Sequence, residues 1–276
     1  MTTHKVDKES LLQNFDNGNF QRYKQYFRDH AQRYAHMINH LQTINIGGQV
    51  LDAGGLPEIS KLLQGYFKNI DNIQLSEDDL ESSDWAKSYK GLFDFALCAE
   101  VIEHLSEDPA EMLHQLNVSL KMGGLLYLTT VNISRLVSIH NIIHGINPLV
   151  FGCYFGKCNS YMRHKREYAP LELAKFVAAH GFACYLFTDD SYITQPYELD
   201  FVKRLVDQLP FLDKNVHGDT IFIVAKKVQE SVGPMRMDPI YCKNVQIPLP
   251  EETSAFVENN VHVGPPLSAL SQLPFA

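Results

Sequence analysis

The sequence lacks the cysteine pattern of a disulfide-stabilised protein. Its 276 residues include five cysteines, an odd and scattered set that indicates reduced thiols. Cys153 and Cys158 have His164 nearby, but their spacing differs from that of structural zinc sites, and no fourth ligand with the usual pairing follows. We therefore expect neither a disulfide framework nor a structural zinc site in this chain.

Long apolar segments are also absent. No window approaches the roughly 18 apolar residues that a membrane helix needs, and the N-terminal residues lack the apolar core of a signal peptide. We expect a cytoplasmic protein that makes no use of a membrane. With 45% hydrophobic residues the chain can bury one sizeable core, which favours a single large α/β domain with insertions.

Basic residues are few. The chain has 24 Lys and Arg residues against 32 Asp and Glu residues, which gives a formal net charge of −8. Neutralisation of phosphates supplies nearly all non-specific nucleic-acid binding, and an acidic chain is poorly suited to it. The compact basic run at residues 163–166 is typical of a solvated loop. Nucleic acid is therefore not an expected partner.

The most informative stretch that is present covers residues 93–105, with the sequence FDFALCAEVIEHL. Its first part, residues 93–98, is a short apolar run that predicts a buried strand. Glu100, Glu103 and His104 follow at spacings that would place them on one face of a single helical turn. Open α/β sheets bind their ligands at the carboxyl ends of the strands, so this stretch predicts a functional site.

A glycine turn precedes that stretch in the sequence. Residues 48–57 read as a short strand with Asp52 at its end, followed by Gly54 and Gly55, and then by a helix that has Pro57 at its first position. Glycines let the backbone approach a ligand, and the helix N-terminus presents N–H donors to an anionic group. This segment therefore predicts a ligand-binding turn.

Apolar runs alternate with helical stretches along the rest of the chain. Further strands are predicted near residues 68–75, 125–130, 182–187 and 220–225, and helices over residues 18–45, 109–121, 170–180 and 198–209. This alternation predicts a mostly parallel sheet with helices on both faces, the strand at residues 50–52 in the centre, and one late antiparallel strand. The acidic loop at residues 76–83 stands where a further helix and strand would be, so one half of the sheet should be abbreviated.

The chain divides into an N-terminal helical cap (residues 1–47), a main domain (residues 48–228) and a proline-rich tail (residues 229–276). Within the main domain, residues 133–168 form an insertion that is longer than an ordinary loop, and we expect it to be a lid or a substrate wall. The low charge of the tail predicts that it packs in an extended form over apolar surface. That surface can belong to the same chain or, in a homodimer, to a second copy.

Several of these segments, in this order, resemble the class I S-adenosylmethionine-dependent methyltransferases, especially the group of ubiquinone-pathway O-methyltransferases. The resemblance covers roughly residues 20–228, and its motifs lie at residues 50–55, 93–105, 120–132, 166–173 and 220–225. It implies a Rossmann-like α/β fold and S-adenosylmethionine as the cofactor. Methyl transfer from a sulfonium is an in-line displacement, for which the protein supplies position and a dry site.

The resemblance also assigns residues to the methionine and ribose parts of the cofactor. Asp52, Gly54 and Gly55 correspond to the turn beneath the methionine part. Gln74 falls near the end of the second strand, where the family has an acidic residue that binds the ribose, and Asp71 is the alternative in another register. A glutamine can accept hydrogen bonds from hydroxyls, but it lacks the charge-assisted strength of a carboxylate.

Further residues are assigned to the rest of the cofactor. Asp79, or its neighbour Asp78, and Leu80 resemble the segment that flanks the adenine. Cys98 lies at the strand end that lines the cofactor in the family, and Arg33 is the expected partner of the cofactor carboxylate.

A second part of the resemblance concerns a metal. The small-RNA 3′-end 2′-O-methyltransferases and some ubiquinone-pathway relatives use a Glu-x-x-Glu-His cluster with a downstream histidine, which implies a divalent-metal site of Glu100, Glu103, His104 and His164. Two carboxylates and two imidazoles suit Mg²⁺, Mn²⁺, Fe²⁺ or Zn²⁺. The catalytic residues would then be His104, Glu103 and His164. Three alternatives remain. His104 acts alone as a general base, His104 is a packed histidine satisfied by the backbone, or the acidic residues only favour the start of a helix.

We expect the protein to methylate a hydroxyl group of a small molecule. N-methylation and 2′-O-methylation of an RNA 3′ end are the alternatives within enzymes. A third alternative is a catalytically silent methyltransferase-like scaffold, because Leu56 and Glu58 replace the later glycines of the family's first motif.

Overall fold

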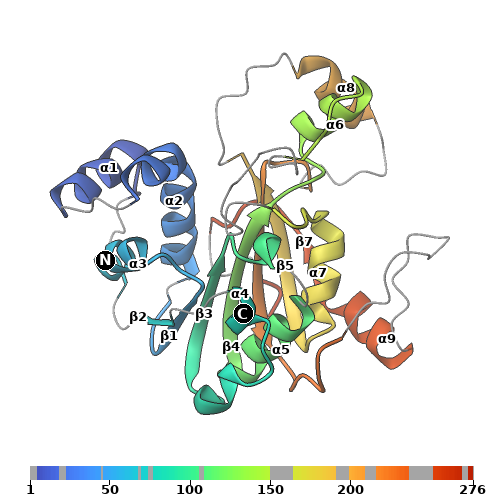
Figure 1. Ribbon diagram of the computed structural model, residues 1–276. Helices are drawn as coiled ribbons and strands as arrows, with labels where there is room; N and C mark the ends of the chain where they lie inside the picture. Colours follow the sequence, from blue (N-terminus) through green and yellow to red (C-terminus); the bar gives the residue numbers. More distant parts are fainter. Residues whose placement is uncertain are drawn as a thin grey trace.

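One sheet organises the computed structural model, and β4 lies in its middle (Figure 1). The structure describes residues 5–18, 23–44, 46–67, 70–73, 77–105, 109–149, 164–190, 199–208, 216–235, 251–268 and 273–275. Within them seven strands pair in the order β2-β1-β3-β4-β6-β5-β7. The strands are β1 (Val50–Ala53), β2 (Ile70–Ile73), β3 (Phe93–Ala99), β4 (Leu120–Val131), β5 (Phe182–Asp189), β6 (Thr220–Lys227) and β7 (Val261–Val263).

The predicted strand directions are confirmed. β6 runs antiparallel to both of its neighbours, β4 and β5, whereas every other pair in the described sheet is parallel. The sheet is therefore a Rossmann-like α/β sheet with one late antiparallel strand. The prediction that β1 is central was wrong, because β1 is the second strand from one edge of the sheet, with β2 at that edge. No further strand lies between β2 and β3 in the part of the chain that the structure describes.

Helices cover both faces of the sheet. On one side lie α1 (Lys8–Asn17), α2 (Lys24–Ile44) and α3 (Pro57–Gln64), and on the other lie α5 (Pro109–Ser119) and α7 (Pro170–Ala178) (Figure 1). The smaller elements are α4 (Glu77–Leu80), η1 (Trp85–Tyr89) and η2 (Ile102–His104). The helix predicted over residues 18–45 corresponds to α2, which begins later, at Lys24, and α3 begins at Pro57 as predicted.

The sequence of β4 explains why both faces are covered. Side chains alternate across a strand, so a strand that is buried on both faces reads as a continuous apolar run. Leu126 and Leu128 pack into the cluster formed with α5 and α7, while Tyr127 between them packs into the cluster formed with α1, α2 and α3. All three are fully buried.

Two helices extend beyond the carboxyl edge of the parallel strands. α6 (Leu136–Ile143) follows β4, α8 (Asp200–Gln208) follows β5, and the two contact each other at the top of Figure 1. α6 belongs to the predicted lid, but residues 150–163 of that insertion lie outside the described residues. None of the described helices combines the length and the apolar character that crossing a membrane requires.

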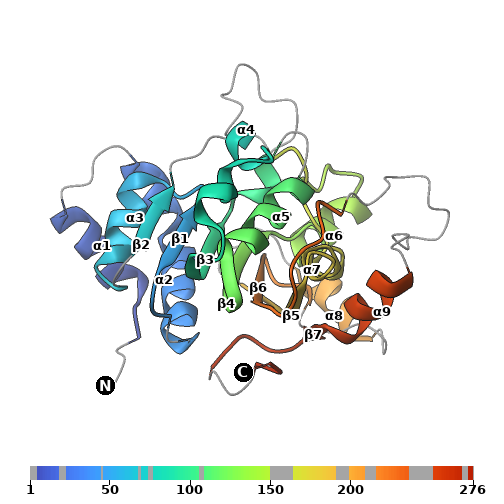
Figure 2. The same cartoon turned by 90° about the horizontal axis from the view of Figure 1, so that it is seen from below.

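The C-terminal segment crosses the edge of the sheet, as seen from below in Figure 2. α9 (Glu251–Asn259) buries Val257 beside α7, and β7 then adds a parallel strand to β5. After β7 the chain reaches the other face, where Leu267 and Leu273 are buried in the cluster that includes Val224. The tail is therefore part of the sheet and of both cores.

Candidate functional site

The site lies where β3 and β4 end, at the carboxyl edge of the sheet. Glu100 follows β3 with a φ of 56°, in the left-handed region that residues other than glycine seldom adopt. Glu103 and His104 then lie in the 3₁₀ turn η2. The prediction that Glu100, Glu103 and His104 share one helical face was wrong, because the backbone at Glu100 is not helical.

Glu103, His104 and His164 come together beside the end of β4. One possible ligand atom from each lies within 4.8 Å of the others, and the two histidine rings are 5.0 Å apart. Glu103 is 1% exposed, and its Oε2 accepts a hydrogen bond of 2.8 Å from Thr130. Its Oε1 has no hydrogen-bond donor among the described residues and lies 3.9 Å from Nε2 of His104.

Burial raises the pKa of Glu103 well above its usual range, and the negative charge of Glu100 raises it further. Burial of this kind disfavours the charged form of the carboxyl group unless a cation compensates its charge. The combination of a buried carboxylate oxygen and two imidazoles is the kind of donor set that binds a divalent transition metal.

The chain around His164 fixes its position against the turn. Nδ1 of His164 lies 3.1 Å from Oε1 of the buried Glu167. The backbone N–H of Lys165 donates to the carbonyl of Glu103 at 2.7 Å, so the two segments are joined directly. A carboxylate on one ring nitrogen orients a histidine so that the other nitrogen faces its ligand. Three of the four predicted metal-binding residues thus fit a metal.

The fourth predicted ligand, Glu100, lies elsewhere. Its Oε2 is 2.7 Å from Nη1 of Arg33, and its Oε1 accepts a hydrogen bond of 2.9 Å from Thr129. Thr129 and Thr130 are neighbours in β4, so Glu100 and Glu103 bind to opposite faces of the same strand end. Arg33, the expected partner of the cofactor carboxylate, is thus bound to Glu100 in this structure.

The predicted cofactor turn has the expected shape. Asp52 is 3% exposed, accepts a hydrogen bond from Ser60, and has its pKa raised to about 6 by burial. Gly54 has a φ of 78°, and a Cβ there would come within 2.8 Å of Val101. A Cβ on Gly55 would collide with the carboxylate of Asp52. Both positions therefore require glycine.

The other predicted cofactor residues are distributed differently. Leu80 is buried next to the glycine turn, whereas Asp79 is exposed. The Cys98 side chain is buried in the core, with Sγ 3.8 Å from Sδ of Met112. Gln74 and the side chains of Asp71 and Asp78 lie outside the described residues, as do Cys153 and Cys158.

Thr129, Thr130 and Glu167 are parts of the site that sequence reasoning missed. The two threonines end an otherwise apolar strand, and Glu167 follows His164 at a spacing of three residues. Polar side chains at the carboxyl end of a buried strand were therefore an available signal.

A hollow of about 330 Å³ lies at the opposite edge of the sheet and takes no part in this site. It is lined by Ile44, Ile46, Gly47, Asp94, Phe95, Lys121, Met122, Gly123, Gly124 and Leu125. By contrast, Asp52, Glu103 and Thr130 lie at or just beyond the carboxyl ends of β1, β3 and β4.

Comparisons with known proteins identify the family. The model of the methyltransferase domain family matches residues 23–186, which is more than half of the chain. No curated protein matches the sequence. Similar solved structures include an S-adenosylmethionine-dependent methyltransferase from Archaeoglobus fulgidus, with 16% identity, a TM-score of 0.48, and coverage of 75% of this chain and 100% of that chain. Another is a possible histamine N-methyltransferase from Thermotoga maritima, with 15% identity, a TM-score of 0.43, and coverage of 80% and 99%.

A third similar structure is the 1,6-didemethyltoxoflavin N1-methyltransferase of Burkholderia thailandensis with bound S-adenosylhomocysteine, at 15% identity, a TM-score of 0.41, and coverage of 80% of this chain and 87% of that chain. The family match extends over the glycine turn, η2 and His164. The chain therefore belongs to the methyltransferase domain family and, with its Rossmann-like sheet, is a class I S-adenosylmethionine-dependent methyltransferase.

Proposed function

We propose that the protein transfers the methyl group of S-adenosylmethionine to a hydroxyl oxygen of a small molecule, with a divalent metal bound by Glu103, His104 and His164. The observation that carries the proposal is Oε1 of Glu103. It is a buried carboxylate oxygen with no hydrogen-bond donor among the described residues, and it lies beside two imidazoles. Burying such an atom costs free energy unless a cation or a proton compensates its negative charge.

The resemblance to the ubiquinone-pathway O-methyltransferases supports a hydroxyl acceptor. A bound divalent metal would lower the pKa of that hydroxyl, so that its oxygen becomes a nucleophile near neutral pH. An amine acceptor becomes a nucleophile by losing an ammonium proton, which a general base can accept without a metal. The net charge of −8 supports a small molecule over an RNA end.

The residues of the chain have separate tasks in this reaction. Asp52 and the glycine turn shape the place of the methionine part of the cofactor, and Glu103, His104 and His164 hold the acceptor side. The acceptor oxygen attacks the methyl carbon while the carbon–sulfur bond breaks, and S-adenosylhomocysteine leaves as a neutral thioether. The proton of the acceptor hydroxyl passes to solvent.

The test uses methyl-labelled S-adenosylmethionine, a panel of hydroxyl and amine acceptors, and protein treated with a chelator. We expect transfer to a hydroxyl acceptor to fall after chelation and to return with Mg²⁺, Mn²⁺, Fe²⁺ or Zn²⁺. Glu103→Gln should remove the response to metal, whereas His262→Gln at an exposed position should behave like the wild type.

Two results would overturn parts of the proposal. Transfer that ignores the chelator but is lost in His104→Gln would contradict the metal and assign the proton transfer to His104 alone. Methylation of amines and not of hydroxyls would contradict O-methylation. Calorimetry with S-adenosylhomocysteine checks the cofactor separately, because a scaffold without activity has no reason to retain that affinity.

A further inference from the structure

Glu100 combines two features that need an explanation. It is the only residue other than glycine with a positive φ in the described part of the chain, and it stands directly between β3 and the turn that carries Glu103 and His104. A backbone in this conformation persists only when its surroundings hold it there. The backbone N–H of Glu100 donates to the carbonyl of Thr129 at 2.9 Å, which fixes one side of the residue.

The side chain of Glu100 fixes the other side. Both carboxylate oxygens are engaged, one by Arg33 and the other by Thr129. The side chains of Arg33 and Glu100 are 6% and 7% exposed, so water screens this ion pair little. Removing one partner of a buried pair leaves an uncompensated charge, which makes such a pair sensitive to mutation.

The ion pair joins two parts of the molecule. Arg33 belongs to α2, which packs on one face of the sheet, and η2 with Glu103 and His104 faces the side of α5 and α7. The Nη2 atom of Arg33 also donates to the hydroxyl of Tyr26 on the same helix, at 3.1 Å. The guanidinium of Arg33 is therefore fixed by a residue of its own helix as well as by Glu100.

We infer that Arg33 and Glu100 are positioning residues, which lock the left-handed backbone at Glu100 and so aim Glu103 and His104 at their ligand. The inference rests on the proposed function, because it concerns the same cluster. It assigns to Glu100 a role distinct from that of a metal ligand. The competing role for Arg33 is direct contact with the cofactor carboxylate, and the two roles give opposite results for substitutions at Glu100.

The experiment compares Arg33→Met, Glu100→Gln and the double variant, each titrated with Mn²⁺ alone and with S-adenosylhomocysteine alone. We expect each single substitution to lower Mn²⁺ affinity by about tenfold, as is typical for residues that orient metal ligands. The double variant should lose little more than either single variant, because both act through one contact. Affinity for S-adenosylhomocysteine should stay within about threefold of the wild type in Glu100→Gln.

Arg28→Met is the matched control. Arg28 lies on the same helix and pairs with Asp16 at 2.7 Å, but its side chain is 41% exposed. We expect no change in either titration. Arg33→Lys keeps the positive charge and serves if Arg33→Met fails to fold, with an intermediate loss of Mn²⁺ affinity expected from its different geometry.

Loss of S-adenosylhomocysteine affinity in Arg33→Met, with Glu100→Gln unchanged in both titrations, would overturn the inference in favour of a cofactor contact. Additive losses in the double variant would also overturn it. If the wild type binds no Mn²⁺, the metal proposal fails by itself. The positioning role then predicts a lower kcat with an unchanged KM for S-adenosylmethionine in both single variants, and wild-type kcat values in both would contradict it.

Discussion

At the scale of single residues, His40 shows how the N-terminal cap depends on pH. It lies on α2, with Nδ1 3.1 Å from the hydroxyl of Tyr127 and Nε2 3.8 Å from Asp189, and its ring packs in T-shaped contacts with Phe187 and Phe222. Burial lowers its pKa to about 4, although the charge of Asp189 opposes that shift. The folded protein therefore holds a neutral imidazole there.

The first prediction concerns stability in acid. The histidine pKa of the unfolded chain is about 6.5, so between pH 6.5 and pH 4 the unfolded chain binds more protons at this position than the folded protein. Stability is then greatest above pH 6.5 and falls as the pH drops through this window, by up to about 3 kcal/mol from His40. Urea denaturation at pH 7 and pH 4.5 should show a smaller acid loss in His40→Gln than in the wild type.

His262→Gln, at an exposed position, should leave the acid loss unchanged. Some acid sensitivity will remain in His40→Gln, because burial lowers the pKa of His30 on the same helix to about 3. An identical acid loss in His40→Gln and the wild type would contradict the neutral state of His40.

Most site residues at this scale could be predicted, because they occupy strand ends and tight turns that the sequence marks directly. Gly54 and Gly55 follow an apolar run, and Glu103 and His104 follow another. The role of Glu100 could not be predicted, because the expected spacing assumed a helical backbone and the residue is left-handed. Its partner Arg33 lies on another element, and nothing local in the sequence joins the two.

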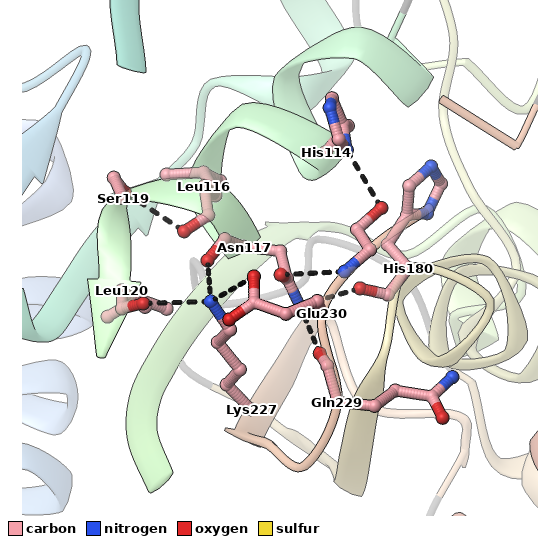
Figure 3. A network of polar contacts seen from close by, with 10 residues as sticks. His114, Leu116, Asn117, Ser119, Leu120, His180, Lys227, Gln229 and Glu230 are labelled. Carbon is pink, nitrogen blue, oxygen red and sulfur yellow. Dashed lines mark hydrogen bonds and ion pairs between the residues drawn. The ribbon is translucent and has the colours of Figure 1, made fainter. Parts of the chain in front are cut away.

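At the scale of elements, a buried lysine from β6 binds the C-terminal end of α5 (Figure 3). Lys227, at the end of β6, is 2% exposed, and its Nζ donates to the carbonyls of Asn117 and Leu120 and pairs with Glu230. The last carbonyls of a helix have no partners within the helix and carry partial negative charge, so a cation there is favourable. The side chain of Asn117 extends the network, because it donates to the carbonyls of His180 and Gln229.

The second prediction is that Lys227→Met destabilises the fold by about 2 to 4 kcal/mol, because it removes a donor from two buried carbonyls. Urea denaturation measures the loss. Lys226→Met, one residue earlier, should cost less than about 1 kcal/mol, since among the described residues its Nζ donates to one carbonyl, that of Phe275. Equal losses in the two variants would contradict this account. Cofactor affinity should not change, because the network lies at the edge of the sheet opposite the glycine turn.

Elements with a clear period could be predicted from the sequence, and those without one could not. α3, α5, α7 and β6 occur close to the expected bounds. β4 begins at Leu120, earlier than expected, because its first residues pair with β3 across an irregularity that includes the two glycines. β7 has three residues and is stabilised by pairing with β5, which sequence periodicity cannot show.

At the scale of the whole molecule, the tail completes the sheet. β7 covers the edge of β5, Val257 of α9 packs beside α7, and Leu267 and Leu273 pack on the other face. An uncovered strand edge is a template for association with another chain. The tail thus protects one strand edge and two apolar surfaces. The sequence predicted its packing over apolar surface but not its strand in the sheet.

The third prediction is that truncation after Met235, or Gly264→Ala in the full chain, loosens this edge. The truncation removes β7, and a Cβ on Gly264 would collide with the ring of Tyr185, whose hydroxyl donates to the carbonyl of Pro265 at 2.9 Å. We expect both changes to lower the urea midpoint and to cause concentration-dependent association in light scattering, because β5 and apolar surface become accessible.

Gly233→Ala is the matched control, since a Cβ there meets nothing within 4 Å, although its φ of 149° makes a small loss from backbone strain expected. Affinity for S-adenosylhomocysteine should stay within about threefold in Gly264→Ala, because residues distant from a site act independently of it. A large loss of that affinity would show that the tail contributes to the cofactor site. A wild-type dimer that becomes monomeric on truncation would instead show that the tail joins two copies of the chain, and the edge of β5 would then be protected within the dimer.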